Sequence, residues 1–400
     1  MKNREEEIKT VLVRGVDTIL PSSKGLKNII TSGKKINIYC GYDPTAPTLH
    51  LGHLFTILKL ADFQSLGHKV IMLIGDFTGM IGDPTDKSET RRKLNREEVI
   101  LNSSNYKKIA QKFIKFSGPN PAKLMYNSSW GDKLSFTDII ELASNFTVQQ
   151  MLVRDMFQER IKRKKPIYLH EFLYPLAQGY DSVAMDIDLE VGGKDQLFNM
   201  LCGRDLVKIL LKKEKFVLGT KLLVDSSGKK MGKTEGPMVA LDAAPEMIYG
   251  KIMSWTDEMI IPGLEGCTRI SMDQIRKMDK EIRSGKRNPF EVKSILAKEV
   301  TRICHNDKAA EAAEKEFNRV FREKEVPSNI KEVKIKEKSQ RLIDLLAQTK
   351  IVSSKNEGRR IISQRGVKVD GVVKTNWEES IPIKKGMILN VGKRRFVKIV

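Results

Sequence analysis

Two histidines, His50 and His53, are spaced to bind an anionic ligand at the beginning of a helix. Apolar residues at helical spacing predict a helix over residues 51–66, and residues three apart share one face of it. The first turn of a helix offers unpaired N–H groups and a positive partial charge, and Gly52 lets a ligand approach the backbone closely. These features predict a nucleotide site in which two imidazoles donate to phosphates. The pattern is short, and two surface histidines at a helix end would produce it equally well.

A second stretch that could meet phosphates is the basic, glycine-containing segment 225–234, Asp-Ser-Ser-Gly-Lys-Lys-Met-Gly-Lys-Thr. Lysine carries a flexible point charge that suits phosphates which move during a reaction. The segment lacks the Gly-x-x-x-x-Gly-Lys-Ser/Thr pattern, so it is not a P-loop. A solvated basic loop is the ordinary alternative.

Three polar residues, Tyr174, Gln178 and Asp181, share one face of a predicted helix because they are spaced by four and three residues. Such a face could hydrogen-bond a small polar ligand, although a polar surface stripe has the same spacing. A predicted strand over residues 186–191 is followed by a Gly-Gly turn and then Asp195. An acid in that position commonly accepts hydrogen bonds from ribose hydroxyls. The Gly-x-Gly-x-x-Gly fingerprint of dinucleotide sites is absent.

The elements that must position these residues form a parallel α/β unit. A period-two run predicts a strand over residues 36–40, the helix 51–66 follows, and the apolar run 70–75 predicts a strand buried on both faces. Ligands of open parallel sheets bind beyond the carboxyl ends of the strands. Three acids follow these strands: Asp43, Asp76 and Asp83. For any one of them alone, an ordinary loop or cap aspartate is the simpler interpretation.

Composition and periodicity divide the rest of the chain into segments. Residues 137–162 predict a long helical segment with Asp138 as its N-cap, and residues 221–224 predict a last short strand. Residues 244–324 have helical periodicity throughout, whereas a charged stretch with Pro327 has none. The last residues predict a small α/β module with a basic helix beside a hairpin at Asp370-Gly371. The basic residues on or near that helix, which would meet a phosphate backbone, are Lys355, Arg359, Arg360 and Arg365. We therefore predict a Rossmann-like catalytic domain (1–235), an all-α domain (236–325), a linker (326–338) and an RNA-binding module (339–400).

The net charge of +21 and the pI of 9.6 favour a polyanionic partner, although a lysine-rich genome would also raise both. The four cysteines form no Cys-x-x-Cys pair, and with five histidines no zinc pattern appears. Reduced thiols fit the cytosol, the first 30 residues lack the apolar core of a signal peptide, and no apolar run has the ~20 residues needed to span a bilayer. A cytoplasmic protein is expected.

The order of the motifs is more specific than any one of them. His50-Leu-Gly-His53, then Tyr174/Gln178/Asp181, then Gly-Gly-x-Asp195-Gln196, then Lys230-Met-Gly-Lys233-Thr234 resembles the class I aminoacyl-tRNA synthetases, most closely the bacterial tyrosyl family. The first motif corresponds to the "HIGH" signature and the last to the "KMSKS" signature. Residues 339–400 resemble an RNA-binding module that many of these enzymes share with a ribosomal protein.

The resemblance implies a role for each matching residue. The phosphates of ATP would be bound by Thr45, His50, Lys230, Lys233 and Thr234, and the nucleoside by His53. The remaining residues around ATP and the adenylate would be Cys40, Gly41, Asp43, Gly52, Gly193 and Asp195. The ammonium group of tyrosine would be bound by Asp83, Tyr174 and Gln178, its carboxylate by Gln196, and its phenolic hydroxyl by Tyr39 and Asp181.

The family activates tyrosine with ATP and passes the tyrosyl group to tRNA, so the resemblance implies both substrates, Mg²⁺ arriving with ATP, a homodimer and an anticodon-recognition role for the all-α domain. No protein ligand for a metal is evident. Gly232 replaces the usual serine of the last motif, and Glu190 and Lys194 stand where glutamine and serine are frequent.

Three alternatives share parts of this pattern. A tryptophanyl enzyme has the same fold and the same first and last motifs, and Asp181 could accept an indole N–H as well as a phenol O–H. The Tyr39/Asp181 pair and the terminal module favour tyrosine. A non-catalytic RNA-binding protein would not need the intact histidines and lysines, and nucleotidylyltransferases with a His-x-Gly-His site are generally much shorter.

Overall fold

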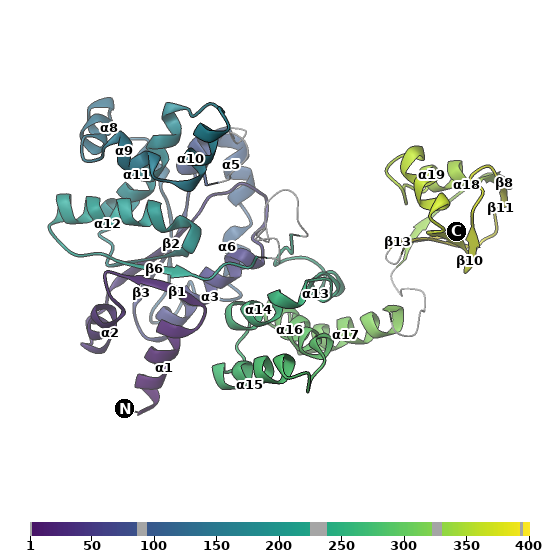
Figure 1. Cartoon of the computed structure of the whole chain (residues 1–400), viewed down its shortest axis with the longest axis horizontal. Coiled ribbons are helices and arrows are strands. Elements are labelled where there is room, and N and C mark those ends of the chain that lie inside the picture. The colour runs from purple at the N-terminus through teal and green to yellow at the C-terminus, as the bar shows by residue number, and fades with distance from the viewer. Residues whose placement is uncertain (1, 86–93, 225–237, 322–329, 393–394) are drawn as a thin grey trace. The chain divides into compact units, whose positions relative to one another are not determined.

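The computed structural model describes residues 2–85, 94–224, 238–321, 330–392 and 395–400. The chain divides into two compact units, Met1–Glu311 and Ala312–Val400. The predicted parallel α/β architecture is confirmed in the first unit (Figure 1). Its sheet has the order β1-β6-β5-β2-β3-β4. The strands are β1 (Val16–Leu20), β2 (Asn37–Tyr42), β3 (Lys69–Ile74), β4 (Lys123–Tyr126), β5 (Leu189–Gly193) and β6 (Phe216–Thr220).

The strand order reverses beside β2. The chain runs from β2 outward to β3 and β4 and then returns to β5, which pairs with β2 on its other side. All these pairs are parallel, and only β1 runs antiparallel, against β6. A crevice at the carboxyl ends of β2 and β5 is therefore the expected ligand site of this sheet.

Helices that carry the predicted motifs pack directly on these central strands. Helix α3 (Leu51–Ser65) packs on β2, β3 and β5, and α12 (Leu197–Leu211) packs on β5 and β6. Helix α11 (Leu169–Ala184), which contains Tyr174, Gln178 and Asp181, packs along α12. The remaining helices of this part are α1 (Lys2–Val13), α2 (Ser23–Thr31), α4 (Thr78–Ile81), α5 (Arg96–Ser103), α6 (Tyr106–Ala110), α7 (Ser128–Gly131) and the 3₁₀ turn η1 (Lys194–Gln196).

Two sequence expectations in this region are wrong. The sequence predicts a single long helix over residues 137–162 with Asp138 as its N-cap, but the segment forms three helices, α8 (Phe136–Ala143), α9 (Val148–Leu152) and α10 (Asp155–Lys162). Ser135 caps α8 and Thr147 caps α9, because each side-chain oxygen accepts from a backbone N–H in the first turn. The last strand of the sheet is the fully buried segment β6 and not residues 221–224.

The helices predicted after residue 244 are present: α13 (Pro245–Met253), the 3₁₀ turn η2 (Asp257–Met259), α14 (Ile260–Cys267), α15 (Met272–Arg283), α16 (Pro289–Cys304) and α17 (Asp307–Phe321). Residues up to Glu311 belong to the same compact unit as the sheet.

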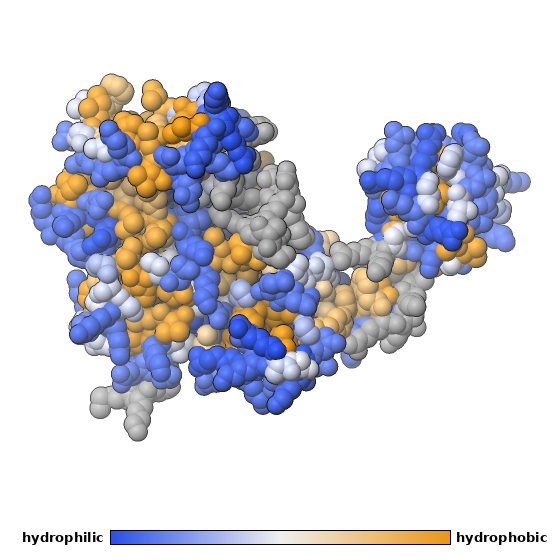
Figure 2. Space-filling model, viewed as in Figure 1, coloured by the Kyte–Doolittle hydropathy of each residue, from blue (hydrophilic) through white to orange (hydrophobic). Residues whose placement is uncertain are grey.

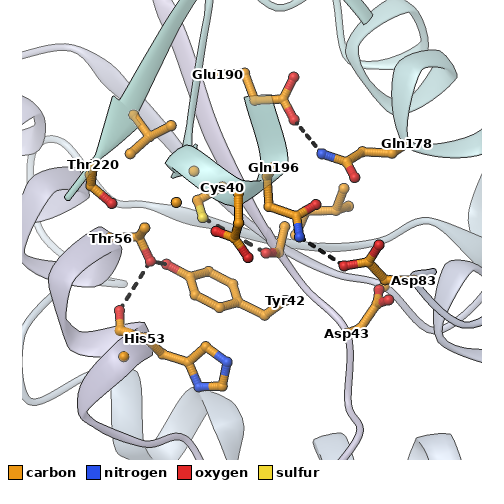
Figure 3. Close-up of a pocket in the computed structure, with 18 of the residues that line it drawn as sticks. Cys40, Tyr42, Asp43, His53, Thr56, Asp83, Gln178, Glu190, Gln196 and Thr220 are labelled. Atoms are coloured by element: carbon orange, nitrogen blue, oxygen red, sulfur yellow. Dashed lines mark hydrogen bonds between the residues drawn. The ribbon is translucent and has the colours of Figure 1, made fainter. Parts of the chain in front are cut away.

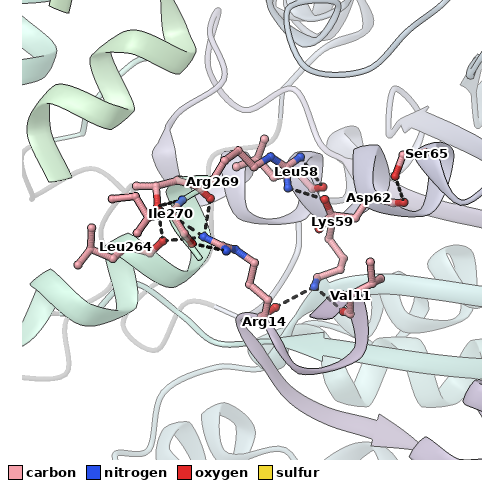
Figure 4. Close-up of polar contacts among 10 residues, drawn as sticks. Val11, Arg14, Leu58, Lys59, Asp62, Ser65, Leu264, Arg269 and Ile270 are labelled. Carbon is pink, nitrogen blue, oxygen red and sulfur yellow. Dashed lines mark hydrogen bonds and ion pairs between the residues drawn. The ribbon is translucent and has the colours of Figure 1, made fainter. Parts of the chain in front are cut away.

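Buried cations join α14 to the N-terminal segment (Figure 4). The guanidinium of Arg14, just after α1, donates to the carbonyl oxygens of Ile270 (2.6 Å), Thr268 (2.7 Å) and Leu264 (3.1 Å). The amine of Lys59 on α3 donates to the carbonyl oxygens of Val11 (2.6 Å) and Arg14 (2.8 Å). We call these residues the junction cluster. It fixes α3 against the helices that follow the sheet.

The second unit is a small α/β module with its own apolar core. Its five-stranded sheet has the order β10-β9-β12-β13-β7, and β8 and β11 form a separate pair. The elements are β7 (Lys331–Val333), β8 (Ser339–Arg341), α18 (Leu342–Gln348), α19 (Lys355–Ser363), β9 (Val367–Val369), β10 (Val372–Lys374), β11 (Ser380–Pro382), β12 (Ile388–Val391) and β13 (Arg395–Ile399).

The predicted hairpin at Asp370-Gly371 joins β9 and β10, and both turn residues have positive φ as a tight hairpin turn requires. Residues 331–333, which the sequence assigned to the linker, form β7 and pair with β13 in parallel. An edge strand of three residues needs only backbone pairing, so it leaves no apolar period to detect. Among the residues that the structure describes, no helix is long and apolar enough to cross a membrane.

Candidate active site

One pocket lies at the carboxyl ends of β2 and β5, and the predicted site residues of the first unit that the structure describes all line it (Figure 3). They are Tyr39, Cys40, Gly41, Asp43, Thr45, His50, Gly52, His53, Asp83, Tyr174, Gln178, Asp181, Gly193, Asp195 and Gln196. Lys230, Lys233 and Thr234 lie outside the described residues. Of the three acids predicted beyond the strands, Asp76 does not line the pocket and accepts instead from Ser128.

The beginning of α3 orients both histidine rings. Nδ1 of His50 accepts from the N–H of Gly52 (3.1 Å), and Nδ1 of His53 accepts from the N–H of His50 (3.2 Å). The rings are stacked with their centroids 3.7 Å apart. Because Nδ1 accepts in each ring, the proton of the neutral imidazole is on Nε2, which makes each Nε2 a donor. Two parallel N–H donors at a helix N-terminus suit phosphate oxygens.

The peptide that follows the lysine segment is fixed beside His50. Leu51 donates its N–H to the carbonyl oxygen of Val239 (3.0 Å), and Leu241 donates to the carbonyl of Leu49 (2.9 Å). On the other flank of that segment, Thr220 to Leu223 line the pocket. The described residues before this segment therefore line the pocket, and those after it are bonded to the beginning of α3.

The carboxylates of Asp43 and Asp83 are held by neighbouring donors. Asp43 accepts from the hydroxyls of Thr78 (2.7 Å) and Tyr174 (2.8 Å). Asp83 accepts from the side-chain amide of Gln196 (2.8 Å) and from the backbone N–H of Thr85 (3.0 Å). The carboxylate of Asp83 therefore lies beside the amide of Gln196. A carboxylate can accept from an ammonium group and an amide can donate to a carboxylate, so together the two side chains complement the α-carbon substituents of an amino acid.

The deepest part of the pocket contains Asp181 and Tyr39. The carboxylate of Asp181 accepts from the indole N–H of Trp130 (2.8 Å) and from Asn127 (3.2 Å), and burial raises its pKa well above the usual range. Burial likewise raises the pKa of Tyr39, whose hydroxyl is 3.2 Å from that of Ser182. The groups that could meet a phenolic hydroxyl are therefore a buried acid and a neutral phenol.

Several contacts around these side chains have no signal in the sequence. Asn127 and Trp130 follow β4, a strand that the sequence did not predict. The hydroxyls of Tyr42 and Thr56 are 3.0 Å apart, and Thr56 donates to the carbonyl of His53 (3.0 Å), so they fix the first turn of α3 from the strand side (Figure 3). Hydrophobic periodicity in the sequence predicts only that such residues are buried and not which hydrogen bonds they form.

The turn after β5 presents Asp195 to the pocket. A Cβ on Gly193 would lie 2.4 Å from a carboxylate oxygen of Asp195, so any other residue there would displace the Asp195 side chain. Lys194 forms an ion pair with Asp17 (3.4 Å). The thiol of Cys40 is buried and its pKa is raised to about 12, so it is a neutral wall group and not a nucleophile. Among the described residues, no group of three His, Cys, Asp or Glu side chains could hold a metal ion.

The basic residues predicted to bind RNA lie on and just after α19 in the second unit. Lys355 forms an ion pair with Asp344 (2.8 Å). Arg359, Arg360 and Arg365 are exposed, and no ion pair is recorded for them among the described residues. Glu357 on the same helix pairs with Arg395 (3.0 Å), and hydrogen bonds from Ser353 together with that pair lower its pKa to about 2.

Comparisons with known proteins match both parts of the chain. Residues 31–322 match the family described as tRNA synthetases class I (W and Y), and residues 317–398 match the tyrosine--tRNA ligase SYY-like C-terminal domain. The chain is 42% identical over 404 residues to tyrosine--tRNA ligase of Carboxydothermus hydrogenoformans (98% of this chain, 97% of that one). It is 39% identical over 393 residues to that of Moorella thermoacetica (97% and 94%).

Solved structures share the fold. A C-terminally truncated mitochondrial tyrosyl-tRNA synthetase of Aspergillus nidulans superposes with a TM-score of 0.66 at 21% identity, covering 80% of this chain and 99% of that one. The enzyme of Archaeoglobus fulgidus, solved with L-tyrosine, gives a TM-score of 0.59 at 20% identity, covering 78% and 99%.

Proposed function

The chain belongs to the class I tyrosine--tRNA ligases, and from that premise we propose which of its residues carry out each part of the reaction. The enzyme activates L-tyrosine with ATP to tyrosyl-adenylate and pyrophosphate and then transfers the tyrosyl group to the 3′ end of tRNA(Tyr). In the first step the tyrosine carboxylate attacks the α-phosphate and no covalent enzyme intermediate is needed. Catalysis then consists of positioning and of stabilising charge on the phosphates.

Tyrosine is bound by its ends. Asp83, Tyr174 and Gln178 receive the ammonium group, and Gln196 donates to the carboxylate. Support comes from the amide of Gln196 standing 2.8 Å from Asp83, so that one amino acid can reach both. Tyr39 and Asp181 meet the phenolic hydroxyl in the buried end of the pocket.

ATP lies at the beginning of α3. Thr45 and the Nε2 donors of His50 and His53 face it, with Asp195 for the ribose. Lys230, Lys233 and Thr234 close over the pyrophosphate. Mg²⁺ arrives with the nucleotide, whose phosphates supply its oxygen ligands. The remaining contacts with the nucleotide come from Cys40, Gly41, Asp43, Gly52 and Gly193.

The observation that carries this assignment is the single pocket in which acceptor-only carboxylates and paired imidazole donors lie together at the strand-order reversal. The test is exchange of labelled pyrophosphate into ATP with tyrosine, phenylalanine or tryptophan as the amino acid. Tyrosine alone should support exchange, because phenylalanine has no hydroxyl with which Tyr39 and Asp181 could form the hydrogen bonds left over from their contacts with Ser182, Trp130 and Asn127. Tyrosyl-tRNA synthetases are the established example of such rejection, at ~10⁵-fold against phenylalanine, and we adopt that figure as the expectation without deriving it. Exchange with tryptophan, or none at all, would contradict the proposal.

We propose that α19 binds the tRNA backbone. Arg359 and Arg360 are exposed, and a phosphate contact would add affinity without sequence preference. Replacing both with alanine should raise the KM for tRNA and reduce the salt slope of binding by about one unit per lost contact, with pyrophosphate exchange unchanged. The matched control is the exposed pair Lys384 and Lys385, whose replacement removes the same charge. Equal effects of the two double variants would refute a specific role for α19.

A homodimer is the proposed assembly. Five large apolar side chains are exposed on or beside the helices α8, α9 and α11, where Figure 2 shows hydrophobic residues gathered: Phe136 (78% exposed), Ile140, Val148, Val153 and Leu169 (83% exposed). An apolar patch of this kind marks a protein interface, and a second copy of the chain is the occupant that the family implies. Phe136→Asp should give a monomer in sedimentation experiments, whereas Val372→Asp in the second unit should not.

The domain division at residues 235 and 325 and a cytosolic location are also proposals. All four cysteines are unpaired and buried, as expected in a reducing compartment. A chain ending at about residue 325 should keep tyrosine-dependent exchange and charge tRNA poorly.

A further inference from the structure

A fully buried lysine lies directly behind the wall of the tyrosine pocket. Lys215 precedes β6, and its amine donates to a carboxylate oxygen of Glu190, to the hydroxyl of Ser182 (2.7 Å) and to the carbonyl oxygen of Met200 (3.2 Å). All three protons of the ammonium group therefore have acceptors. Burial lowers the pKa of Lys215, and the carboxylate of Glu190 opposes that shift.

A glycine on α12 makes room for this amine. A Cβ on Gly203 of α12 would lie 2.6 Å from the nitrogen of Lys215 and 3.3 Å from the Cα of Gly179 on α11. The two helices thus approach closely enough for the lysine to pass between them and β5. Burying an ion pair costs desolvation free energy. Here the absence of a side chain at Gly203 leaves the space that the buried amine occupies.

Glu190 connects that lysine to the pocket. Its other carboxylate oxygen accepts from the side-chain amide nitrogen of Gln178 (3.0 Å; Figure 3). Glu190 and Gln178 both line the pocket, whereas Lys215 and Ser182 do not. An ionised carboxylate can only accept hydrogen bonds, so it selects the amide orientation in which Gln178 presents nitrogen to Glu190 and oxygen to the other side.

We propose that the Glu190–Lys215 pair is a positioning device that turns the amide oxygen of Gln178 toward the ammonium group of bound tyrosine. This inference rests on the tyrosine site proposed above and adds to it two residues that never touch the reacting atoms. The amine of Lys215 donates to one carboxylate oxygen of Glu190, and the other oxygen remains as the acceptor for the amide nitrogen of Gln178.

Two double variants separate positioning from structural support. Glu190→Leu/Lys215→Met and Glu190→Gln/Lys215→Met both remove the two charges, so neither leaves an unpaired buried ion. They differ in whether residue 190 offers Gln178 an acceptor. Calorimetric titration would compare tyrosine and tyramine, which have an ammonium group, with 3-(4-hydroxyphenyl)propionate, which has none.

In the leucine variant the affinity for tyrosine and tyramine should fall by about ten- to a hundredfold, the loss of one hydrogen bond to a charged group. The affinity for 3-(4-hydroxyphenyl)propionate should change by no more than about twofold, within the effect of a distant substitution. The glutamine variant should rescue most of the ammonium-dependent affinity. If the leucine variant does not fold, Glu190→Met/Lys215→Met replaces it and refills the same volume.

A matched control is the equally buried pair of Arg160 and Glu171, whose atoms are 2.7 Å apart outside the pocket lining. Arg160→Met/Glu171→Met should leave the affinity ratio of tyramine to the propionate unchanged. The inference is overturned if the leucine variant weakens all three ligands equally, or if the two Glu190 variants bind tyrosine equally well. Failure of the proposed function is distinguishable, because the unaltered enzyme would then show no tyrosine-dependent pyrophosphate exchange.

Discussion

The beginning of α3 and the junction cluster at its middle use buried polar groups in opposite ways. At the beginning of α3, Nδ1 of each histidine ring accepts from a backbone N–H, which leaves the proton of the neutral ring on Nε2. In the junction cluster, the amine of Lys59 and the guanidinium of Arg14 donate to backbone carbonyls of neighbouring segments. The hydrogen bonds of the histidines thus fix the orientation of side chains that line the pocket, whereas those of the junction cluster connect segments of the fold to one another. Burial and charge alone do not distinguish these cases, but the chemistry of the partner does.

The strongest test of this contrast is at the beginning of α3. His50→Ala should lower the rate of tyrosine activation by about 10²–10³-fold, as for loss of one preorganised donor, and should leave tyrosine affinity nearly unchanged. Loss of the N-cap should also cost about 1 kcal/mol of unfolding free energy. Single-turnover activation and urea unfolding measure the two effects.

His50→Asn separates those effects, because asparagine is an effective N-cap but too short to place a donor where the imidazole Nε2 lies. Stability should recover and the rate should not. Recovery of both would mean that His50 acts only through the helix.

The converse test concerns the junction cluster. Arg14→Met should lower the free energy of unfolding by about 2–3 kcal/mol, because three buried carbonyl oxygens lose a charged donor. The KM for tyrosine should not change. The exposed pair of Arg163 and Glu159 serves as the control, since Arg163→Met should cost less than about 0.5 kcal/mol. If Arg14→Met unfolds like the unaltered enzyme but activates tyrosine poorly, the junction cluster does not act through stability and differs from the pocket less than we infer.

The residues that line the pocket were easier to predict from the sequence than the residues that hold them in place. Asp43, His50, Asp83 and Asp195 follow strands or begin helices, and topology brings such positions to one edge of a parallel sheet. Trp130 follows a strand with no clear pattern, and its contact with Asp181 joins residues 51 positions apart. Hydrophobic periodicity is blind to contacts of this kind.

Charged residues that are buried were the hardest to predict. Lys215 occurs in lysine-rich surroundings and Lys59 lies in an apolar helix, and for any lysine an exposed side chain is the ordinary expectation. Their burial depends on acceptors from segments distant in the sequence: Val11 and Arg14 for Lys59, and Glu190 for Lys215. Likewise β7 depends on its pairing with β13 and not on any pattern of its own. Only the folded chain supplies these partners.

The smallest expected effect concerns the protonation of Lys59. Burial lowers its pKa from 10.5 to about 8, so between these values the unfolded chain binds a proton that the folded chain does not. Stability must then rise with pH across that window, by ~1.4 kcal/mol per unit at most. A neutral amine still has two N–H groups for the carbonyls of Val11 and Arg14, so deprotonation relieves the cost of a buried charge without breaking either contact.

Lys59→Met removes this titration. The unfolding free energy of the unaltered enzyme, minus that of Lys59→Met, should be constant below about pH 8 and should increase by about 1–2 kcal/mol on going to pH 9.5. Taking the difference cancels the other groups that titrate in the same range. Urea unfolding at several pH values measures it, and a difference that falls with pH would show that Lys59 is held as a cation. In that case the carbonyls would stabilise its charge more than burial opposes it, and the junction cluster would resemble the Lys215 site in preserving a buried positive charge.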